Sequence, residues 1–159
     1  MYLTVSKRFE FSASRRLVID GWSDEQNAAA FGRGNTGMYG TGRNYTTYFV
    51  FHGEVEASTG MLINIADIKG HVSDLLAQRY DHKFLNADTA PFDKLIPTPE
   101  RVATQMLEDI QPAFTAFTAA PVVCHVDESP DRGATVYASG RAESHYSISF
   151  SAARWQEQR

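Results

Sequence analysis

Cysteine is almost absent from this sequence, since Cys124 is the only one among 159 residues. A single cysteine excludes an internal disulfide and suits a reducing compartment. The spacings that usually indicate a zinc site built from one chain, CxxC, HxH and HExxH, are missing as well. We therefore expect a cytoplasmic protein with no bound metal or other cofactor.

Long apolar runs and blocks of like charge are also missing. No apolar run approaches the ~20 residues of a membrane span, and residues 1–11 lack the apolar core of a signal peptide. The formal net charge is only −4, which argues against a nucleic-acid or membrane surface. The hydrophobic content of 43% and the length are those of a globular domain that can bury its own core.

The residues that are present predict strands first. Tyr2–Phe11 alternates between apolar and polar residues, which is the period of a half-buried strand. This strand continues toward Leu17, and Gly53 indicates a bulge in the next one. The further expected strands are Asn44–Glu56, Pro121–Glu128, Ala134–Ser139 and, near the C-terminus, Tyr146–Phe150.

Two helices are expected in the middle of the chain. Asp67–Arg79 has apolar residues at helical spacing, with Asn64 as its N-cap. A second helix begins after Thr98, because Pro99 is suited to the first helical position. The polar segment Asp20–Asn27 is interpreted as a loop.

The resulting order ββααββ predicts an α+β fold in which both helices cover one face of an antiparallel sheet. The first two long strands keep large residues on both faces, such as Tyr2 beside Leu3 and Tyr48 beside Phe49. We therefore expect another copy of the chain to bury the second face, giving a homo-oligomer.

The segment 31–45 holds five glycines and leads directly into the second strand. So much glycine permits close backbone approach, as the wall of a pocket requires. Its polar side chains are Asn35, Thr41, Arg43 and Asn44. The alternative interpretation is a long flexible loop, partly disordered.

Seven short motifs in this order resemble the 6-pyruvoyl-tetrahydropterin synthase family, which includes the 6-carboxytetrahydropterin synthases. They are FSASRRL at 11–17, FGRG at 31–34, GTGRNY at 40–45, TGMLINIADIK at 59–69, YDHKFLN at 80–86, PTPERVA at 97–103 and DES at 127–129. The resemblance implies the tunnelling fold over residues 1–140, with residues 141–159 as a C-terminal extension and a candidate added strand. It also implies a barrel of several chains, a trimer or hexamer, with sites between subunits.

The sequence departs from the family where the resemblance would place a zinc ion. Arg15, Thr41 and Arg43 stand in the places of the family's zinc-binding histidines, and Gly34 stands in place of its cysteine. A guanidinium has no lone pair to give a metal and stays charged. We therefore expect no zinc at this place.

Other family features are kept. Asp81 and His82 match the family's proton-transfer pair, and Glu128 matches the glutamate that anchors the pterin ring, with Thr98 as a further candidate contact. A carboxylate can accept two parallel N–H bonds from the amidine-like edge of such a ring. Without the resemblance, Glu128 would be read as a solvated acid before a turn, and Asp81–His82 as the end of a helix.

Arg15 and Arg43 leave two alternatives open. Two guanidiniums in one pocket repel each other unless an anion joins them. Either they form a local salt bridge, with Asp81 as a candidate partner, or they bind an anionic ligand. Cys124 is interpreted as a buried apolar residue. The other histidines, which show no ligand spacing and are interpreted as structural or surface residues, are His52, His71, His125 and His145.

Two functions follow as hypotheses. The first is a zinc-independent protein that binds a pterin-like or related anionic small molecule at Glu128, Arg15, Arg43, Thr98 and Thr41. If active, it would be a metal-independent lyase or isomerase that uses Asp81 and His82 in an elimination or tautomerisation. The second is a non-catalytic ligand-binding or scaffold oligomer that has lost the family's chemistry.

Overall fold

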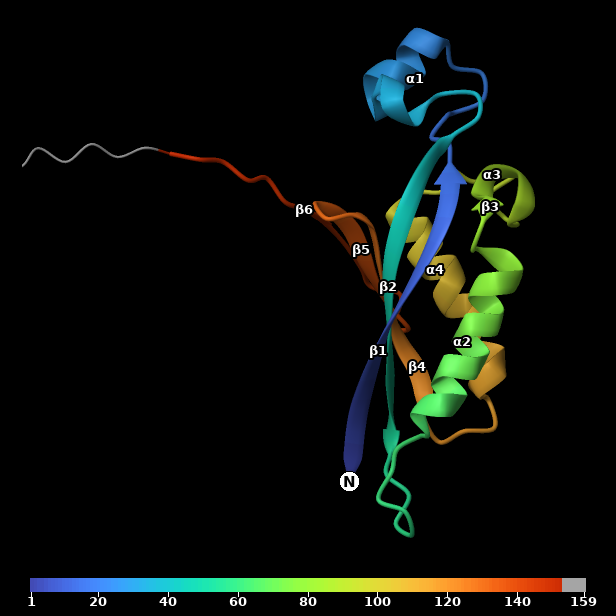
Figure 1. Cartoon of the computed structure of the whole chain (residues 1–159), viewed down its shortest axis with the longest axis vertical. Coiled ribbons are helices and arrows are strands. Elements are labelled where there is room, and N and C mark those ends of the chain that lie inside the picture. The colour runs from blue at the N-terminus through green and yellow to red at the C-terminus, as the bar shows by residue number, and fades with distance from the viewer. Residues whose placement is uncertain (153–159) are drawn as a thin grey trace, which may run out of the picture.

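A six-stranded sheet with the order β3-β1-β2-β4-β5-β6 organises the computed structural model, which describes residues 1–152 (Figure 1). Neighbouring strands are antiparallel, except that the short β3 runs parallel to β1. The strands are β1 (Tyr2–Arg15), β2 (Thr41–Glu54), β3 (Lys83–Phe84), β4 (Ala120–Ser129), β5 (Arg132–Tyr137) and β6 (Ala142–Tyr146).

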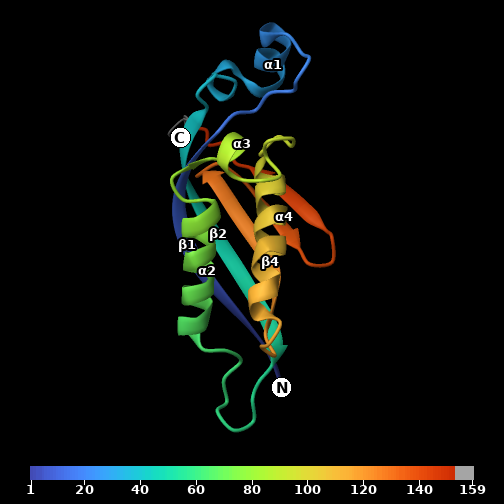
Figure 2. The ribbon, with the colours of Figure 1, turned by 90° about the vertical axis from the view of Figure 1, so that its right-hand side faces the viewer.

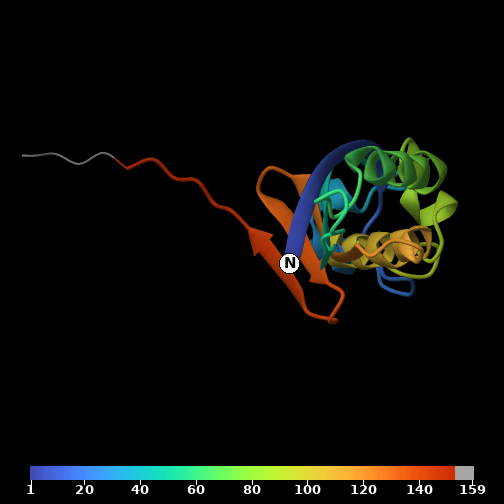
Figure 3. The same ribbon diagram turned by 90° about the horizontal axis from the view of Figure 1, so that it is seen from below.

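Helices α2 (Ile65–Arg79) and α4 (Pro99–Ile110) pack side by side on one face of this sheet (Figures 2 and 3). The side chain of Asn64 accepts a hydrogen bond from the backbone N–H of Ala66 and so caps α2, as expected. The layer between helices and sheet is the apolar core, whose fully buried members include Phe49, Phe51, Ile68, Val72, Val102, Met106 and Val126. The predicted α+β class and the ββααββ order are confirmed.

The alternation of β1 sets the position of its last residue. Phe11 and Ala13 point into the core, while Ser12 and Ser14 lie half-buried on the other face. Phe11 stacks on Tyr45 of β2 with ring centroids 4.7 Å apart. Arg15 continues the buried series, so the strand period carries a guanidinium to the helix-covered side, where it is 0% exposed.

The segment expected to be a loop before the glycine-rich stretch is instead partly helical. Helix α1 spans Asp24–Phe31, and Ser23 and Gln26 form a reciprocal capping box at its start. A 3₁₀ turn, Arg33–Asn35, follows it. The remaining short elements are α3 (Leu85–Asp88) and the 3₁₀ turn Gln111–Phe114. The capping box explains why so polar a segment forms a helix.

Two predicted details of the strands are wrong. The last strand pairs Tyr146 with Arg132, where β5 begins, so residues 147–152 have no strand beside them in the described part of the chain. Accordingly Ile148 and Phe150 are 77% and 87% exposed. The irregularity in the pairing of β2 with β4 lies between Val50 and Phe51 rather than at Gly53, and the extra residue is Val122 of β4.

Glycine at position 53 is explained by close packing and not by a bulge. A Cβ added there would lie 2.4 Å from the carbonyl oxygen of Thr118, so a side chain does not fit.

Part of the expected C-terminal extension joins the sheet as β6, although the division at residue 140 stays a prediction. Residues 153–159 of that extension lie outside the described part of the chain. Within the described residues, no helix has the length and apolar character needed to cross a membrane.

Candidate functional site

Arg15 and Glu128 form a buried ion pair at the ends of β1 and β4. Nε and Nη2 of Arg15 donate to Oε2 of Glu128 over 2.9 and 2.6 Å. The two side chains are 0% and 2% exposed. The partner of Arg15 is therefore Glu128, the residue expected to anchor a ligand, and not Asp81. Arg15 pairs with Glu128 because its side chain leaves β1 on the helix-covered face of the sheet.

Asn35 connects Arg15 with Arg43. Its Oδ1 accepts from Nη1 of Arg15 over 2.9 Å and from Nη2 of Arg43 over 3.0 Å. The same side chain donates through Nδ2 to the carbonyl oxygen of Phe31 over 2.7 Å, which fixes the amide in this orientation. The glycine-rich segment thus folds over the end of the sheet. The two arginines converge as expected, but on a neutral amide oxygen.

This arginine cluster, defined as Arg15, Asn35, Arg43 and Glu128, carries more positive than negative charge. Nη1 of Arg132 lies 3.5 Å from Oε1 of Glu128, so two guanidiniums contact this carboxylate, while the third, Arg43, is joined to Arg15 through Asn35. Among the described residues, Nε of Arg43 and the hydroxyl of Tyr45 are buried without a hydrogen-bond partner.

Burial raises the pKa of the Tyr45 hydroxyl well above its usual range. The cluster therefore has unused donors and a surplus of positive charge, both of which suit a polar or anionic group.

The residues at the place where the sequence resemblance implies a zinc ion do not fit one. Arg15 is held against Glu128, and Arg43 donates to Asn35. Thr41 donates its hydroxyl hydrogen to the carbonyl oxygen of Gly34. None of these groups offers the nitrogen, thiolate or carboxylate ligand that zinc takes in proteins.

Asp81 and His82 lie at the outer edge of β1, directly after α2. Oδ1 of Asp81 accepts from the backbone N–H of Ser12 over 2.9 Å, and the backbone N–H of His82 donates to the carbonyl oxygen of Ser12 over 2.6 Å. The imidazole Nε2 lies 3.5 Å from Oδ2 of Asp81, and the His82 side chain is 84% exposed. The pair is therefore anchored by its backbone and its carboxylate, while the imidazole faces solvent.

Two hollows connect this pair with the glycine-rich side of the sheet. Arg43 and His82 both line a hollow of about 580 Å³ beside Ser14 and Asn44. Tyr45, Asp81 and His82 line a second one of about 500 Å³. The structure thus brings Arg43 near His82, while Arg15 and Glu128 line neither hollow. Thr98, half-buried at the start of α4, lines neither as well.

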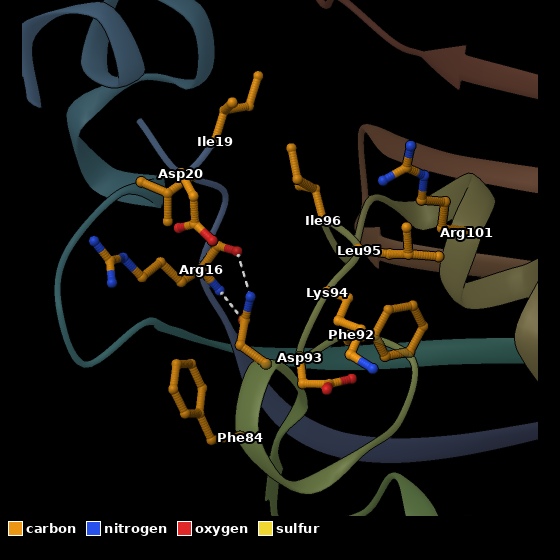
Figure 4. A pocket seen from close by; sticks show the side chains of 12 residues that line it. Arg16, Ile19, Asp20, Phe84, Phe92, Asp93, Lys94, Leu95, Ile96 and Arg101 are labelled. Atoms are coloured by element: carbon orange, nitrogen blue, oxygen red, sulfur yellow. Dashed lines mark hydrogen bonds between the residues drawn. The ribbon is translucent and has the colours of Figure 1, made fainter. Parts of the chain in front are cut away.

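A third cavity of about 540 Å³ lies beyond the end of β1 (Figure 4). Arg16 and Arg101 border it on opposite sides, and Asn86 binds both backbone groups of Arg16. None of the predicted site residues lines it. Sequence reasoning gave no reason to single out this place.

Cys124 is fully buried, as expected for a small apolar residue. Burial raises the pKa of its thiol to about 12, so it stays protonated and is a poor nucleophile. Two of the histidines expected to be structural or surface residues, His125 and His145, lie close together on the open face of the sheet. Their separation in the sequence concealed this proximity.

Comparisons with known proteins agree on one family. The family described as 6-pyruvoyl tetrahydropterin synthase matches residues 4–139. The human 6-pyruvoyl tetrahydrobiopterin synthase is 39% identical over 107 residues, which are 67% of this chain and 73% of that protein. The corresponding protein of Poecilia reticulata is 31% identical over 127 residues, 80% of this chain and 84% of its own.

Solved structures show the same fold. That of Caenorhabditis elegans 6-pyruvoyl tetrahydropterin synthase superposes with a TM-score of 0.73 at 25% identity, covering 93% of this chain and 97% of that one. A catalytic-residue mutant of the Plasmodium vivax 6-pyruvoyltetrahydropterin synthase has a TM-score of 0.57 at 16% identity, covering 86% and 97%.

Proposed function

Because the chain belongs to the 6-pyruvoyl tetrahydropterin synthase family, we propose that it binds a pterin-like small molecule bearing an anionic group. Binding needs no zinc ion at Arg15, Thr41 and Arg43. The observation that carries this proposal is the arginine cluster. Among residues 1–152, Arg43 donates to the neutral oxygen of Asn35, and its buried Nε has no hydrogen-bond partner. A carboxylate or phosphate is the partner that such a guanidinium lacks.

Glu128 supplies the second half of the recognition. Both short bonds from Arg15 end on Oε2, so Oε1 keeps acceptor capacity for the N–H edge of a pterin ring. Among the residues that the structure describes, Arg132 is the one side chain that approaches Oε1, at 3.5 Å, and it is 43% exposed. A ring edge that reaches Glu128 from this side displaces a partly solvated arginine and leaves the buried pair with Arg15 intact.

Turnover, where it occurs, is assigned to His82. An exposed imidazole next to a carboxylate can move a proton, and Arg43 lines the same hollow. An elimination or tautomerisation needs such a proton transfer and a positive group near the developing oxyanion. The protein would then act as a metal-independent lyase or isomerase.

One observation favours the second hypothesis, a non-catalytic ligand-binding or scaffold oligomer. The buried bond of Arg15 to Glu128 occupies half of the carboxylate that the ligand needs. This hypothesis predicts no turnover with any pterin.

Calorimetry with neutral pterin and with a pterin carboxylate tests the proposal. Arg43→Ala should lower the affinity for the pterin carboxylate about 10- to 100-fold, because one charge-assisted hydrogen bond is lost. The affinity for neutral pterin should change little. Glu128→Gln should weaken both ligands, with thermal unfolding confirming that the variant folds. Arg33→Ala, which removes an exposed guanidinium of the same segment, is the matched control.

Equal affinities in wild type and in both cluster variants would overturn the proposal. For turnover, phosphate release from a pterin with a phosphorylated side chain should be lost in His82→Asn while the affinity is kept. Absence of release in the wild type, despite binding, would instead support the non-catalytic hypothesis.

A further inference from the structure

Three side chains that could hold a metal gather on the sheet face opposite the helices, away from the arginine cluster. His125 and Asp127 leave β4 on this face, and His145 leaves the edge strand β6. Nε2 of His125 lies 3.0 Å from Oδ2 of Asp127, and Nε2 of His145 lies 2.9 Å from Oδ1. One candidate ligand atom from each residue can be chosen so that all lie within 4.8 Å of one another.

Gly133 makes this arrangement possible. In the sheet register, Asp127 faces Gly133, which faces His145, so the two side chains are two strands apart. A Cβ on Gly133 would lie 2.3 Å from Oδ1 of Asp127 and 2.5 Å from Cε1 of His145. The missing side chain is therefore the space in which the carboxylate and the imidazole meet.

The ring of His125 is held in one orientation by a contact on its far nitrogen. Nδ1 of His125 lies 2.7 Å from the hydroxyl oxygen of Thr135, which leaves Nε2 to face Asp127. The rings of His125 and His145 are stacked, with centroids 5.2 Å apart and planes 3° from parallel. A hydrogen bond on the far nitrogen fixes the ring of a metal-bound histidine in the same way.

We propose that His125, Asp127 and His145 bind a divalent transition-metal ion, with zinc as the first candidate. Two imidazole nitrogens and one carboxylate oxygen are the ligands that zinc takes in sites with an open position. Magnesium and calcium are disfavoured because they require oxygen ligands. At Zn–N distances of about 2.0–2.1 Å, tetrahedral ligands are about 3.3 Å apart. The three ligand atoms, which now lie within 4.8 Å of one another, must therefore draw together when the ion binds.

The side chains leave room for a ligand from solution. His125, Asp127 and His145 are 23%, 28% and 41% exposed, so the site opens toward solvent on the side of β6. The proposal does not depend on the proposed function, since no residue of the arginine cluster takes part.

Metal titration of the chelator-treated protein, expressed without a polyhistidine tag, tests the site. Calorimetry with Zn²⁺ should show one ion per chain, and Co²⁺ should give visible absorption in the intensity range of tetrahedral sites. His145→Ala, a truncation at an exposed edge, should weaken Zn²⁺ by about 100-fold or more, because loss of an outer-shell partner alone costs 10- to 100-fold. Thr135→Val, which removes such an outer-shell partner, should lower the affinity for Zn²⁺ by about 10- to 100-fold.

His52→Ala is the matched control, because His52 is an exposed histidine on the same sheet face with Thr4 as its neighbour. It should leave the affinity for Zn²⁺ unchanged, and so should Arg43→Ala. The proposal is overturned if no ion binds, if binding survives His145→Ala, or if His52→Ala reduces it equally. A failure of pterin binding would leave these results unaffected.

Discussion

Both short hydrogen bonds from Arg15 to Glu128 end on the same carboxylate oxygen, Oε2, at 2.9 and 2.6 Å. The pair therefore uses one carboxylate oxygen, and within residues 1–152 the other oxygen has Arg132 as its sole neighbour, at 3.5 Å. Two bonds to one oxygen hold the carboxylate in place and leave acceptor sites on the other oxygen unused. Glu128 can therefore hold the fold together and still recognise a ligand.

Breaking this pair should destabilise the protein strongly. Arg15→Met leaves the carboxylate of Glu128 buried without its partner, a situation that costs about 3–5 kcal/mol. Urea unfolding followed by circular dichroism measures the change. The double variant Arg15→Met with Glu128→Leu should recover much of the loss, because apolar replacements of buried pairs are often neutral. A loss below ~1 kcal/mol in the single variant would contradict the burial of the pair.

Stability should fall at alkaline pH through Cys124. Its pKa is raised from 9.0 to about 12 by burial, so the folded state retains a proton that the unfolded state releases. The stabilising contribution is complete below pH 9 and declines as pH rises toward 12, with a loss on the order of 1 kcal/mol by pH 10. Urea unfolding between pH 8 and 10 should show this slope in the wild type and a smaller one in Cys124→Ala. Identical slopes would count against the assignment.

A negative charge in the middle of the arginine cluster should imitate a bound anion. Asn35→Asp places a carboxylate where Oδ1 now accepts from Arg15 and Arg43. We expect this variant to lower the affinity for a pterin carboxylate by about 10-fold or more, while the affinity for neutral pterin stays the same. Asn64→Asp, which keeps an N-cap on α2 and lines neither hollow of the site, is the charge-matched control. Equal losses in both variants would point to a general charge effect instead.

The chain should form a trimer or hexamer in solution. The motivating features are the open sheet face and the exposed apolar residues at the start of β1, where Tyr2 and Leu3 are 68% and 39% exposed. Sedimentation velocity at micromolar concentration gives the mass of the particle. A stable monomer would rule out a barrel of several chains and any site shared between subunits.

The fold could be predicted because its signals are local. Period-two alternation placed Phe11 and Ala13 on the buried face, and Asn64 and Pro99 marked the starts of the two long helices. Helix α1 was missed because its signal is a capping box at Ser23 rather than an apolar stripe. The position of the last strand was missed because it depends on where β5 begins.

The interior of the site could not be predicted in the same way. The partner of Arg15, Glu128, lies 113 residues away in the sequence, and the two side chains come together only when the sheet buries them. His145 reaches Asp127 only because Gly133 separates them in the register. A glycine in a strand can indicate close approach, but the sequence does not say of which side chains.

The sheet ends in two unlike edges, and this difference constrains how copies can join. β3 pairs with β1 only at Ala13 and Ser14, so among the described residues the first half of β1 is one edge, and β6 is the other. Association through one edge of each kind is heterologous, with a different surface on each partner. Such contacts close into a ring only when the curvature of each sheet returns the last copy to the first. In a ring built this way, a substitution that flattens the sheet would turn closure into the growth of an open filament.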